Sequence, residues 1–163
     1  MPALAIPDAP AEIFSDPQGA VFLASALSGQ ALFKEACLTC HGEGGTGKGP
    51  QSEGLVDAEG DPIVPRDLSR AYIKSGRSAR DVYKAIATGL DGTPMPAFAE
   101  IYPPEKIWKL VSYVFFLRAQ GNGDFPREEE LNSNLVARYT AERDAKKALE
   151  QKEKGPEEEE SWD

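Results

Sequence analysis

The sequence predicts a mainly α-helical protein of one domain with a charged C-terminal appendage. Its 163 residues match the size of one ordinary domain. Thirteen prolines and fifteen glycines indicate short helices separated by loops. No stretch alternates Val or Ile with polar residues as a half-buried strand does. We therefore expect an all-α fold.

Residues 1–19 are predicted to form an irregular lead-in because prolines at positions 2, 7, 10 and 17 interrupt them. No Lys or Arg precedes Lys34, so the positively charged region of a signal peptide is missing. Either a leader has been removed, or this chain is cut from a longer polypeptide.

Residues 16–41 are helical in character, and Gly29 inside this pattern marks either a break between two helices or a close helix crossing. Residues 42–65 are rich in glycine and proline and are predicted to be a long loop. A loop of this length is uncommon in a compact domain unless it wraps around something.

Two short helices are predicted over residues 65–76 and 78–90, the second capped by Ser78 and ended by Gly89. Residues 91–98 form a turn or loop, because prolines flank Met95 on both sides. Residues 103–121 are the clearest helix, with proline in the first turn and Gly121 as a stop. Its apolar positions fall at helical spacing: Ile107, Leu110, Val111, Val114 and Leu117.

The composition changes after Phe125. Residues 126–163 contain seven Lys or Arg and twelve Asp or Glu, a net charge of −5. Leu131, Leu135 and Tyr139 recur every four residues, which indicates that the first turns of this extension pack on the core. Beyond them we expect a projecting, solvated helix and a disordered acidic end. The predicted division is a lead-in (1–19), a central domain (20–125) and a charged helical extension (126–163).

The net charge of −9 argues against nucleic acid as a partner, because phosphate binding needs clustered Lys and Arg. No window approaches the run of about 20 apolar residues that spans a bilayer. We therefore expect neither nucleic-acid binding nor a membrane span in this chain.

Two motifs overlap in the stretch from Glu35 to Pro50. The run from Gly42 to Lys48 resembles part of a phosphate-binding loop, but that motif requires Ser or Thr after the lysine, and position 49 is glycine. It also requires a preceding apolar strand, and cysteines and a histidine stand there instead. The phosphate-loop interpretation is therefore rejected.

Cys37-x-x-Cys40-His41 is the motif of covalent c-type haem attachment. In it, two thiols bind the haem vinyl groups and the adjacent histidine ligates the iron. A structural zinc site needs four ligands, and these three residues exhaust the cysteines and histidines of the chain. A redox dithiol is typical of a βαβ context, which is missing here. The motif therefore predicts one haem c, bound through Cys37 and Cys40, with His41 on the iron.

Met95 is the candidate for the second axial ligand. The chain has one His and two Met, and the other methionine is Met1. Prolines on both sides of Met95 stiffen the backbone, which suits the presentation of one side chain at a fixed angle. The alternative is that Met95 only fills a gap in the core.

These segments resemble the class I cytochromes c, specifically bacterial single-haem domains, over roughly residues 30–120. The resemblance rests on "FKEACLTCHGEGGTGKGP", "PRDL", "IATGLDGTPMPAF" and "IWKLVSYVFFLRAQ" in this order. It implies a small all-α fold around one haem, with His41 as proximal and Met95 as distal ligand. It also implies that the N-terminal helix crosses the C-terminal helix, placing Gly29 or Phe33 against Tyr113 or Trp108. Glycines after the motif then let the backbone pass close to the haem.

The resemblance further implies an exported, periplasmic protein, because haem c is attached outside the bacterial cytoplasm. Arg66 is a candidate partner for a haem propionate, or else a solvated arginine. Basic residues recur from Arg66 to Lys84 and either attract an acidic redox partner or form a solvated helix face.

The leading functional hypothesis is an electron carrier without enzymatic activity, which exchanges single electrons with respiratory redox proteins through a His/Met-ligated haem. A second hypothesis is a haem-based catalyst or gas sensor in which Met95 is displaceable. A third is that the chain is an electron-entry subunit of a larger respiratory complex.

Overall fold

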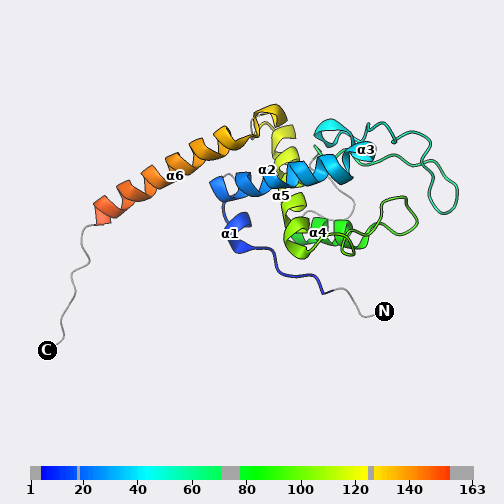
Figure 1. Ribbon diagram of the computed structural model, residues 1–163, viewed down its shortest axis with the longest axis horizontal. Coiled ribbons are helices and arrows are strands. Elements are labelled where there is room, and N and C mark those ends of the chain that lie inside the picture. Colours follow the sequence, from blue (N-terminus) through cyan, green and yellow to red (C-terminus); the bar gives the residue numbers. More distant parts are fainter. Residues whose placement is uncertain (1–4, 18, 71–77, 125–126, 155–163) are drawn as a thin grey trace.

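The structure is a computed structural model that describes residues 5–17, 19–70, 78–124 and 127–154. Over these ranges the regular elements are helices, with one isolated bridge between Val56 and Pro62, so the predicted all-α fold is confirmed. The α-helices are α1 (Ala11–Phe14), α2 (Ala20–Ala36), α3 (Leu38–His41), α4 (Ala79–Thr88), α5 (Pro104–Gly121) and α6 (Ser133–Lys154), and the short 3-10 helices are η1 (Glu43–Gly45) and η2 (Glu128–Glu130) (Figure 1).

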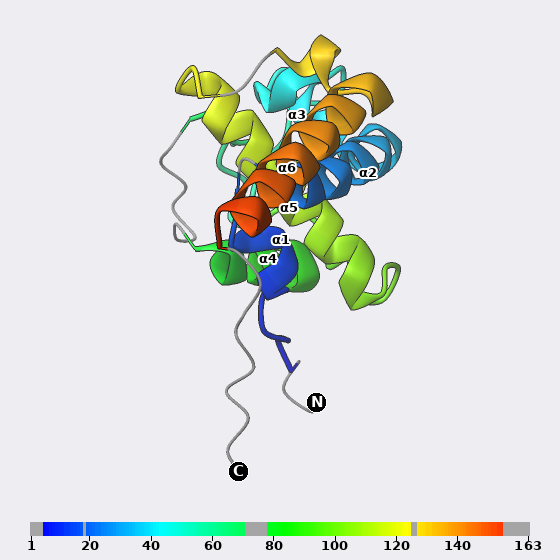
Figure 2. The same cartoon turned by 90° about the vertical axis from the view of Figure 1, so that its left-hand side faces the viewer.

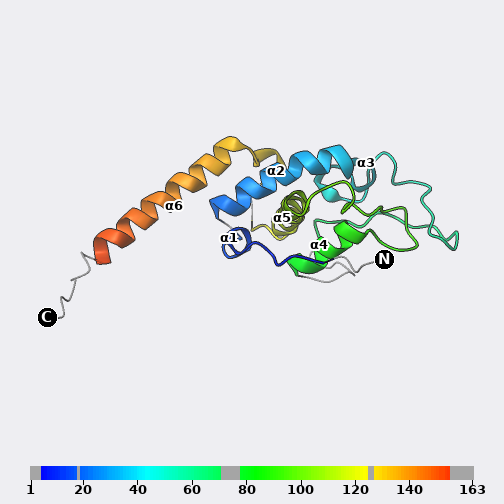
Figure 3. The same cartoon turned by 60° about the horizontal axis from the view of Figure 1, so that its bottom comes forward.

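Helices α2 and α5 cross at the centre of the molecule. In Figure 3, α5 is seen nearly end-on, with α2 passing across one side of it and α4 lying on the other. Gly29 lies at the crossing, where an added Cβ would overlap the Lys109 carbonyl and approach Tyr113 Cβ to 2.9 Å. The Phe33 and Tyr113 rings pack edge to face with centroids 5.1 Å apart. The predicted close crossing is confirmed, and the alternative break at Gly29 is wrong because α2 runs through it.

Helix α4 begins and ends where its sequence predicts. Ser78 Oγ accepts a hydrogen bond from the Asp81 amide, and the Asp81 carboxylate accepts one from the Ser78 amide, which completes a capping box. Gly89 follows the last turn with a φ of 67°. The helix predicted over residues 65–76 is wrong for 65–70, where Asp67 accepts a hydrogen bond from the Ser69 amide in a turn. The remainder, 71–76, lies outside the described residues.

The lead-in packs on the core instead of remaining wholly irregular. Residues 11–14 form α1, and the Phe14 ring lies 5.7 Å from the Trp108 ring and 6.0 Å from the Phe115 ring. The Phe22 ring is 6.3 Å away on α2. Burial of this aromatic ring against three others stabilises a helix of four residues that would not form alone.

The C-terminal extension begins in the core and then leaves it. Leu131 is 3% exposed and Leu135 is 6% exposed, as the four-residue spacing predicts. Glu128 in η2 accepts a short hydrogen bond from the hydroxyl of Tyr113, which lies fully buried on α5. Farther along, α6 is exposed and projects from the body (Figures 1 and 2). The predicted disordered end, residues 155–163, lies outside the described residues.

Two leucines of the extension test this anchoring. Leu131→Ala should lower the free energy of unfolding by about 3 kcal/mol, because it removes a buried side chain and leaves a cavity. Leu149→Ala is the matched control, since Leu149 is 62% exposed on α6 and its loss should change stability by less than about 0.5 kcal/mol. Urea unfolding followed by circular dichroism measures both. Equal effects would contradict anchoring by Leu131.

Candidate haem-binding site

Cys37, Cys40 and His41 lie on one turn at the junction of α2 and α3. Cys37 ends α2, with its amide donating to the Phe33 carbonyl at 2.8 Å, and its own carbonyl accepts from the His41 amide at 2.8 Å. Residues three apart on a helical turn lie on the same side, so the two thiols share a face. Both cysteines are partly buried and free of a disulfide. One turn of the chain therefore carries two thiols and an imidazole.

A backbone hydrogen bond fixes the tautomer of His41. Its Nδ1 lies 3.1 Å from the carbonyl oxygen of Arg66, which only accepts hydrogen bonds. Nδ1 therefore carries the proton and Nε2 keeps its lone pair, as metal-ligating histidines require. Burial lowers the pKa of His41, opposed by the Arg66 hydrogen bond, so the imidazole is neutral at pH 7. Burial, with a contribution from Cys40, raises the pKa of Cys37 to about 12.

The glycine-rich segment after His41 folds back over α3. Amides of this segment satisfy the last carbonyls of the helix: Gly47 donates to His41 at 2.7 Å and Gly49 donates to Cys40 at 3.1 Å. An added Cβ on Gly49 would overlap the Thr39 carbonyl, so only glycine allows this approach. The glycines thus bring the backbone close to α3. Their predicted approach to the haem itself stays a prediction.

Met95 lies in the loop between α4 and α5, which is held at both ends. Its carbonyl accepts from the Leu90 amide at 3.3 Å, and its amide donates to Thr93 Oγ1 at 3.3 Å. After Met95, the Phe98 amide donates to the Ile86 carbonyl at 3.1 Å. The Met95 side chain is partly buried against the core. The predicted loop is therefore present, and its backbone is tied to the end of α4.

The side chains around these residues fit a haem. Several apolar side chains pack on the core and remain partly exposed, including Cys37, Leu38, Leu68, Met95 and Ala99. Apolar side chains, two thiols and a neutral imidazole together match the chemistry of a haem, which is an apolar macrocycle with an iron at its centre. Burial, Glu35 and then Cys37 raise the pKa of Tyr102, which follows the loop that contains Met95.

Four of the five predicted site residues lie together. Cys37, Cys40 and His41 share one turn, and His41 contacts the Arg66 carbonyl, whereas Met95 lies in a separate loop. Arg66 contributes its carbonyl oxygen, whereas the sequence analysis considered only its guanidinium, which lies on an exposed residue. Every residue has a carbonyl, so no sequence signal identifies this role. The analysis also missed Glu128, whose hydrogen bond joins the extension to the helix crossing.

An all-α fold built on the crossing of α2 and α5, together with a Cys-x-x-Cys-His turn and partly exposed apolar side chains, defines a c-type cytochrome domain. The family model described as "Cytochrome C oxidase, cbb3-type, subunit III" matches residues 24–114, more than half of the chain. The chain belongs to this family of c-type cytochrome domains. Membership implies a covalently bound c-type haem and haem-based electron transfer.

A solved structure supports this assignment. A chain of the reducing HAO-like protein complex from Kuenenia stuttgartiensis is 40% identical, with a TM-score of 0.56. The match covers 58% of the present chain and 44% of that chain, so it spans less than half of the neighbour's length. No curated protein matches. Among the described residues, no helix is both long and apolar enough to cross a membrane.

Proposed function

We propose that this protein is a single-haem electron-transfer domain in which Cys37 and Cys40 hold the haem and His41 and Met95 ligate its iron. The haem, when bound, supplies a one-electron Fe(III)/Fe(II) couple. The observation that carries this proposal is the hydrogen bond from His41 Nδ1 to the Arg66 carbonyl, which leaves Nε2 free to bind iron. His41 is the single histidine of the chain, so no second imidazole competes for the role.

Met95 completes the proposed ligand pair. Its backbone is fixed by hydrogen bonds at 3.3 Å on both its amide and its carbonyl, and prolines at positions 94 and 96 restrict rotation around it. A ligand held in this way resists displacement by small molecules. If His41 and Met95 both bind the iron, the haem would transfer electrons and would have no open position for a substrate, so we propose a carrier that is not an enzyme by itself.

The native context follows from the same chemistry. Haem c is attached outside the bacterial cytoplasm, so the domain is assigned to the periplasm, with respiratory redox proteins as donor and acceptor. The structural neighbour is a chain of a protein complex. This supports a role as a subunit of a larger assembly alongside the role of a free carrier. The propionate role of the Arg66 guanidinium remains part of the proposal.

The experiment is absorption spectroscopy on protein produced together with a haem c maturation system. The pyridine haemochrome gives the number of haems per chain, and spectra of the oxidised and dithionite-reduced forms give the spin state. Carbon monoxide is then added to the reduced form. One haem per chain, a low-spin spectrum, a weak long-wavelength sulfur-to-iron band and no response to carbon monoxide are the expected results.

Two outcomes would overturn the proposal in different ways. Absence of covalent haem in the wild-type protein, compared with a Cys37→Ser/Cys40→Ser control, would remove the haem assignment. Covalent haem that binds carbon monoxide readily would remove the closed ligand pair, and the catalyst or gas-sensor hypothesis with a displaceable Met95 would replace it.

A further inference from the structure

Two loops meet at the end of the molecule opposite α6. They are residues 49–65, here called the 50s loop, and residues 89–98, here called the methionine loop because they contain Met95 (Figures 1 and 3). The amide of Ala58 donates to the carbonyl of Gly92 at 2.8 Å. A hollow of about 310 Å³ lies at this junction, lined by Val56, Asp57, Ala58, Gly92 and Thr93. The methionine loop is thus continuous with an outward-facing surface.

Each of the two loops carries an exposed apolar side chain. Val56 is 48% exposed and lines the hollow, and Leu90 is 42% exposed at the start of the methionine loop. The Leu90 amide donates to the carbonyl of Met95 at 3.3 Å, so this apolar side chain lies on the same short turn as the candidate ligand. Apolar side chains left in water beside a redox site favour contact with another protein.

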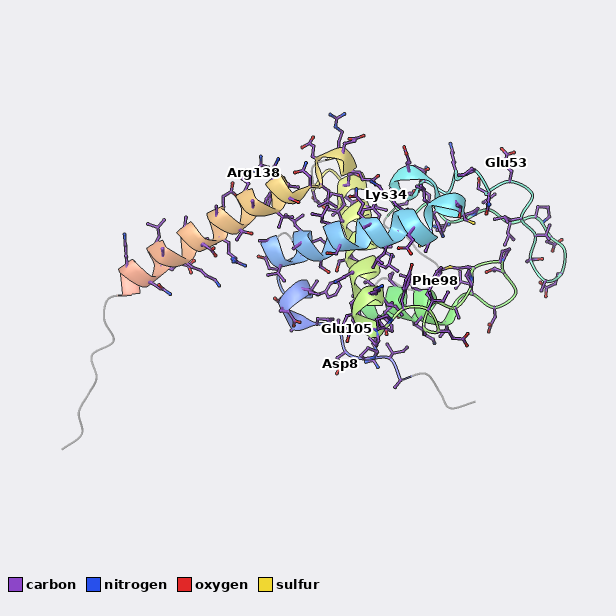
Figure 4. All side chains as sticks on the ribbon, viewed as in Figure 1. Asp8, Lys34, Glu53, Phe98, Glu105 and Arg138 are labelled. Carbon is purple, nitrogen blue, oxygen red and sulfur yellow. The ribbon has the colours of Figure 1, made fainter. Side chains whose placement is uncertain are left out.

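Exposed carboxylates lie in the same two loops. Glu59, Asp61 and Asp91 are exposed, and each lies within three residues of the Ala58–Gly92 hydrogen bond along the chain. Glu53, on the arm of the 50s loop, points away from the body (Figure 4). Residues 49–65 and 89–103 contain no Lys or Arg. The surface therefore has a single sign of charge, with no cation of its own loops to neutralise it.

Asp57 has a different role from these carboxylates. Its Oδ1 accepts from the Glu59 amide at 3.1 Å and from the Asp61 amide at 2.8 Å. It therefore shapes the turn that presents its neighbours, and it must be kept in any variant that tests charge.

Two residues of the basic series noted in the sequence are paired with carboxylates elsewhere. Arg70 pairs with Asp67 at 3.0 Å, and Arg80 pairs with Asp8 at 3.3 Å. Lys74 and Arg77 lie outside the described residues. Because these two arginines already have acidic neighbours, they are less suited to attract an acidic partner. The 50s loop and the methionine loop, by contrast, contain no Lys or Arg that opposes their carboxylates.

The geometry points to the hollow between the 50s loop and the methionine loop as the docking surface for a redox protein whose contact face carries Lys and Arg around an apolar centre. This inference rests on the proposed function, since it names the kind of partner that exchanges electrons at the same haem. The carboxylates of this protein and the Lys and Arg of the partner attract each other and steer the encounter, and the exposed apolar side chains of the two loops then provide contact. Such an encounter weakens as salt screens these charges.

The test uses the holoprotein and two oxidants of opposite charge. Reduced protein is mixed in a stopped-flow apparatus with tris(phenanthroline)cobalt(III), a cation, or hexacyanoferrate(III), an anion. One electron passes from the reduced protein to the metal complex, giving cobalt(II) or iron(II) and oxidised protein. The variant Glu59→Gln/Asp61→Asn/Asp91→Asn should lower the second-order rate with the cation by about tenfold at low ionic strength and raise the rate with the anion. In 0.5 M salt the difference should nearly vanish.

The control removes the same charge from the other end of the molecule. Glu142→Gln/Asp144→Asn/Glu150→Gln changes three exposed carboxylates on α6 and should alter both rates by less than about twofold. The reduction potential and absorption spectrum of each variant are measured on the same samples, so that changes in driving force are separated from changes in steering.

The outcomes separate this inference from the proposed function. Equal effects of the two triple variants, or no effect of either, on a normal low-spin haem would overturn the docking surface and leave the electron-transfer function intact. Failure of the wild-type protein to form a redox-active haem would overturn the proposed function itself. A lower rate that is seen only with the loop variant and the cationic oxidant would support the docking surface.

Discussion

Replacement of Met95 by alanine should lower the reduction potential of the haem and open its iron to carbon monoxide. A thioether ligand favours the ferrous over the ferric form, so its loss stabilises the ferric form. Axial ligands tune haem potentials over about 0.8 V, and we expect a decrease on the order of 0.1 V. Spectroelectrochemical titration measures the potential, and a carbon monoxide difference spectrum measures access to the iron.

Leu90→Ala is the matched control for this substitution. Leu90 lies in the same loop and is 42% exposed, so its truncation removes an apolar side chain without removing a sulfur atom. Its spectrum should stay low-spin and inert to carbon monoxide. If Met95→Ala also kept the wild-type spectrum, Met95 would be a core residue and another group would close the site.

Replacement of Gly29 by alanine should destabilise the protein by about 3 kcal/mol, although alanine favours helices by about 1 kcal/mol over glycine. The new methyl group would overlap the Lys109 carbonyl and crowd Tyr113. The helix backbones cannot yield as a flexible side chain would, so α2 and α5 must move apart. The contact between Phe33 and Tyr113 beside the crossing would then loosen. Chemical unfolding of the holoprotein, followed by far-ultraviolet circular dichroism, gives the change.

Ser28→Ala provides the comparison within the same helix. Ser28 is exposed, and its hydroxyl only donates to the carbonyl of Ala24 one turn earlier at 3.1 Å. This change should alter stability by less than about 0.5 kcal/mol. A stability of Gly29→Ala equal to or above that of the wild type would show that the two helices do not cross as closely as the structure places them.

The helices with complete local signals were predicted well. Helix α4 has a Ser78 cap, an Asp81 that returns the hydrogen bond and a Gly89 stop, all readable within one segment. Helix α5 begins with proline and carries its apolar residues at helical spacing. The prediction was wrong for α1 because a four-residue helix has too little periodicity to detect. Its stability depends on Phe14 meeting Trp108 and Phe115 from a distant helix.

Residues 65–70 show the opposite error. Arg66 and Arg70 are four residues apart, a spacing that suits a helix, yet Asp67 accepts hydrogen bonds from the Ser69 amide and hydroxyl and from Arg70. Short side-chain hydrogen bonds of this kind compete with a helix, and a pattern of hydrophobicity does not record them. The resulting turn is what presents the Arg66 carbonyl to His41.

The sequence by itself determined the covalent chemistry of the candidate site. A Cys-x-x-Cys-His motif, one histidine and one internal methionine leave few choices, because side-chain identity limits which atoms bind a haem and its iron. The tertiary structure decided the rest. The proton on His41 depends on a carbonyl 25 residues away, the glycine at the crossing depends on the backbone of α5, and the acidic surface depends on two loops that meet. Backbone groups carry no residue identity, so only the fold determines where they lie.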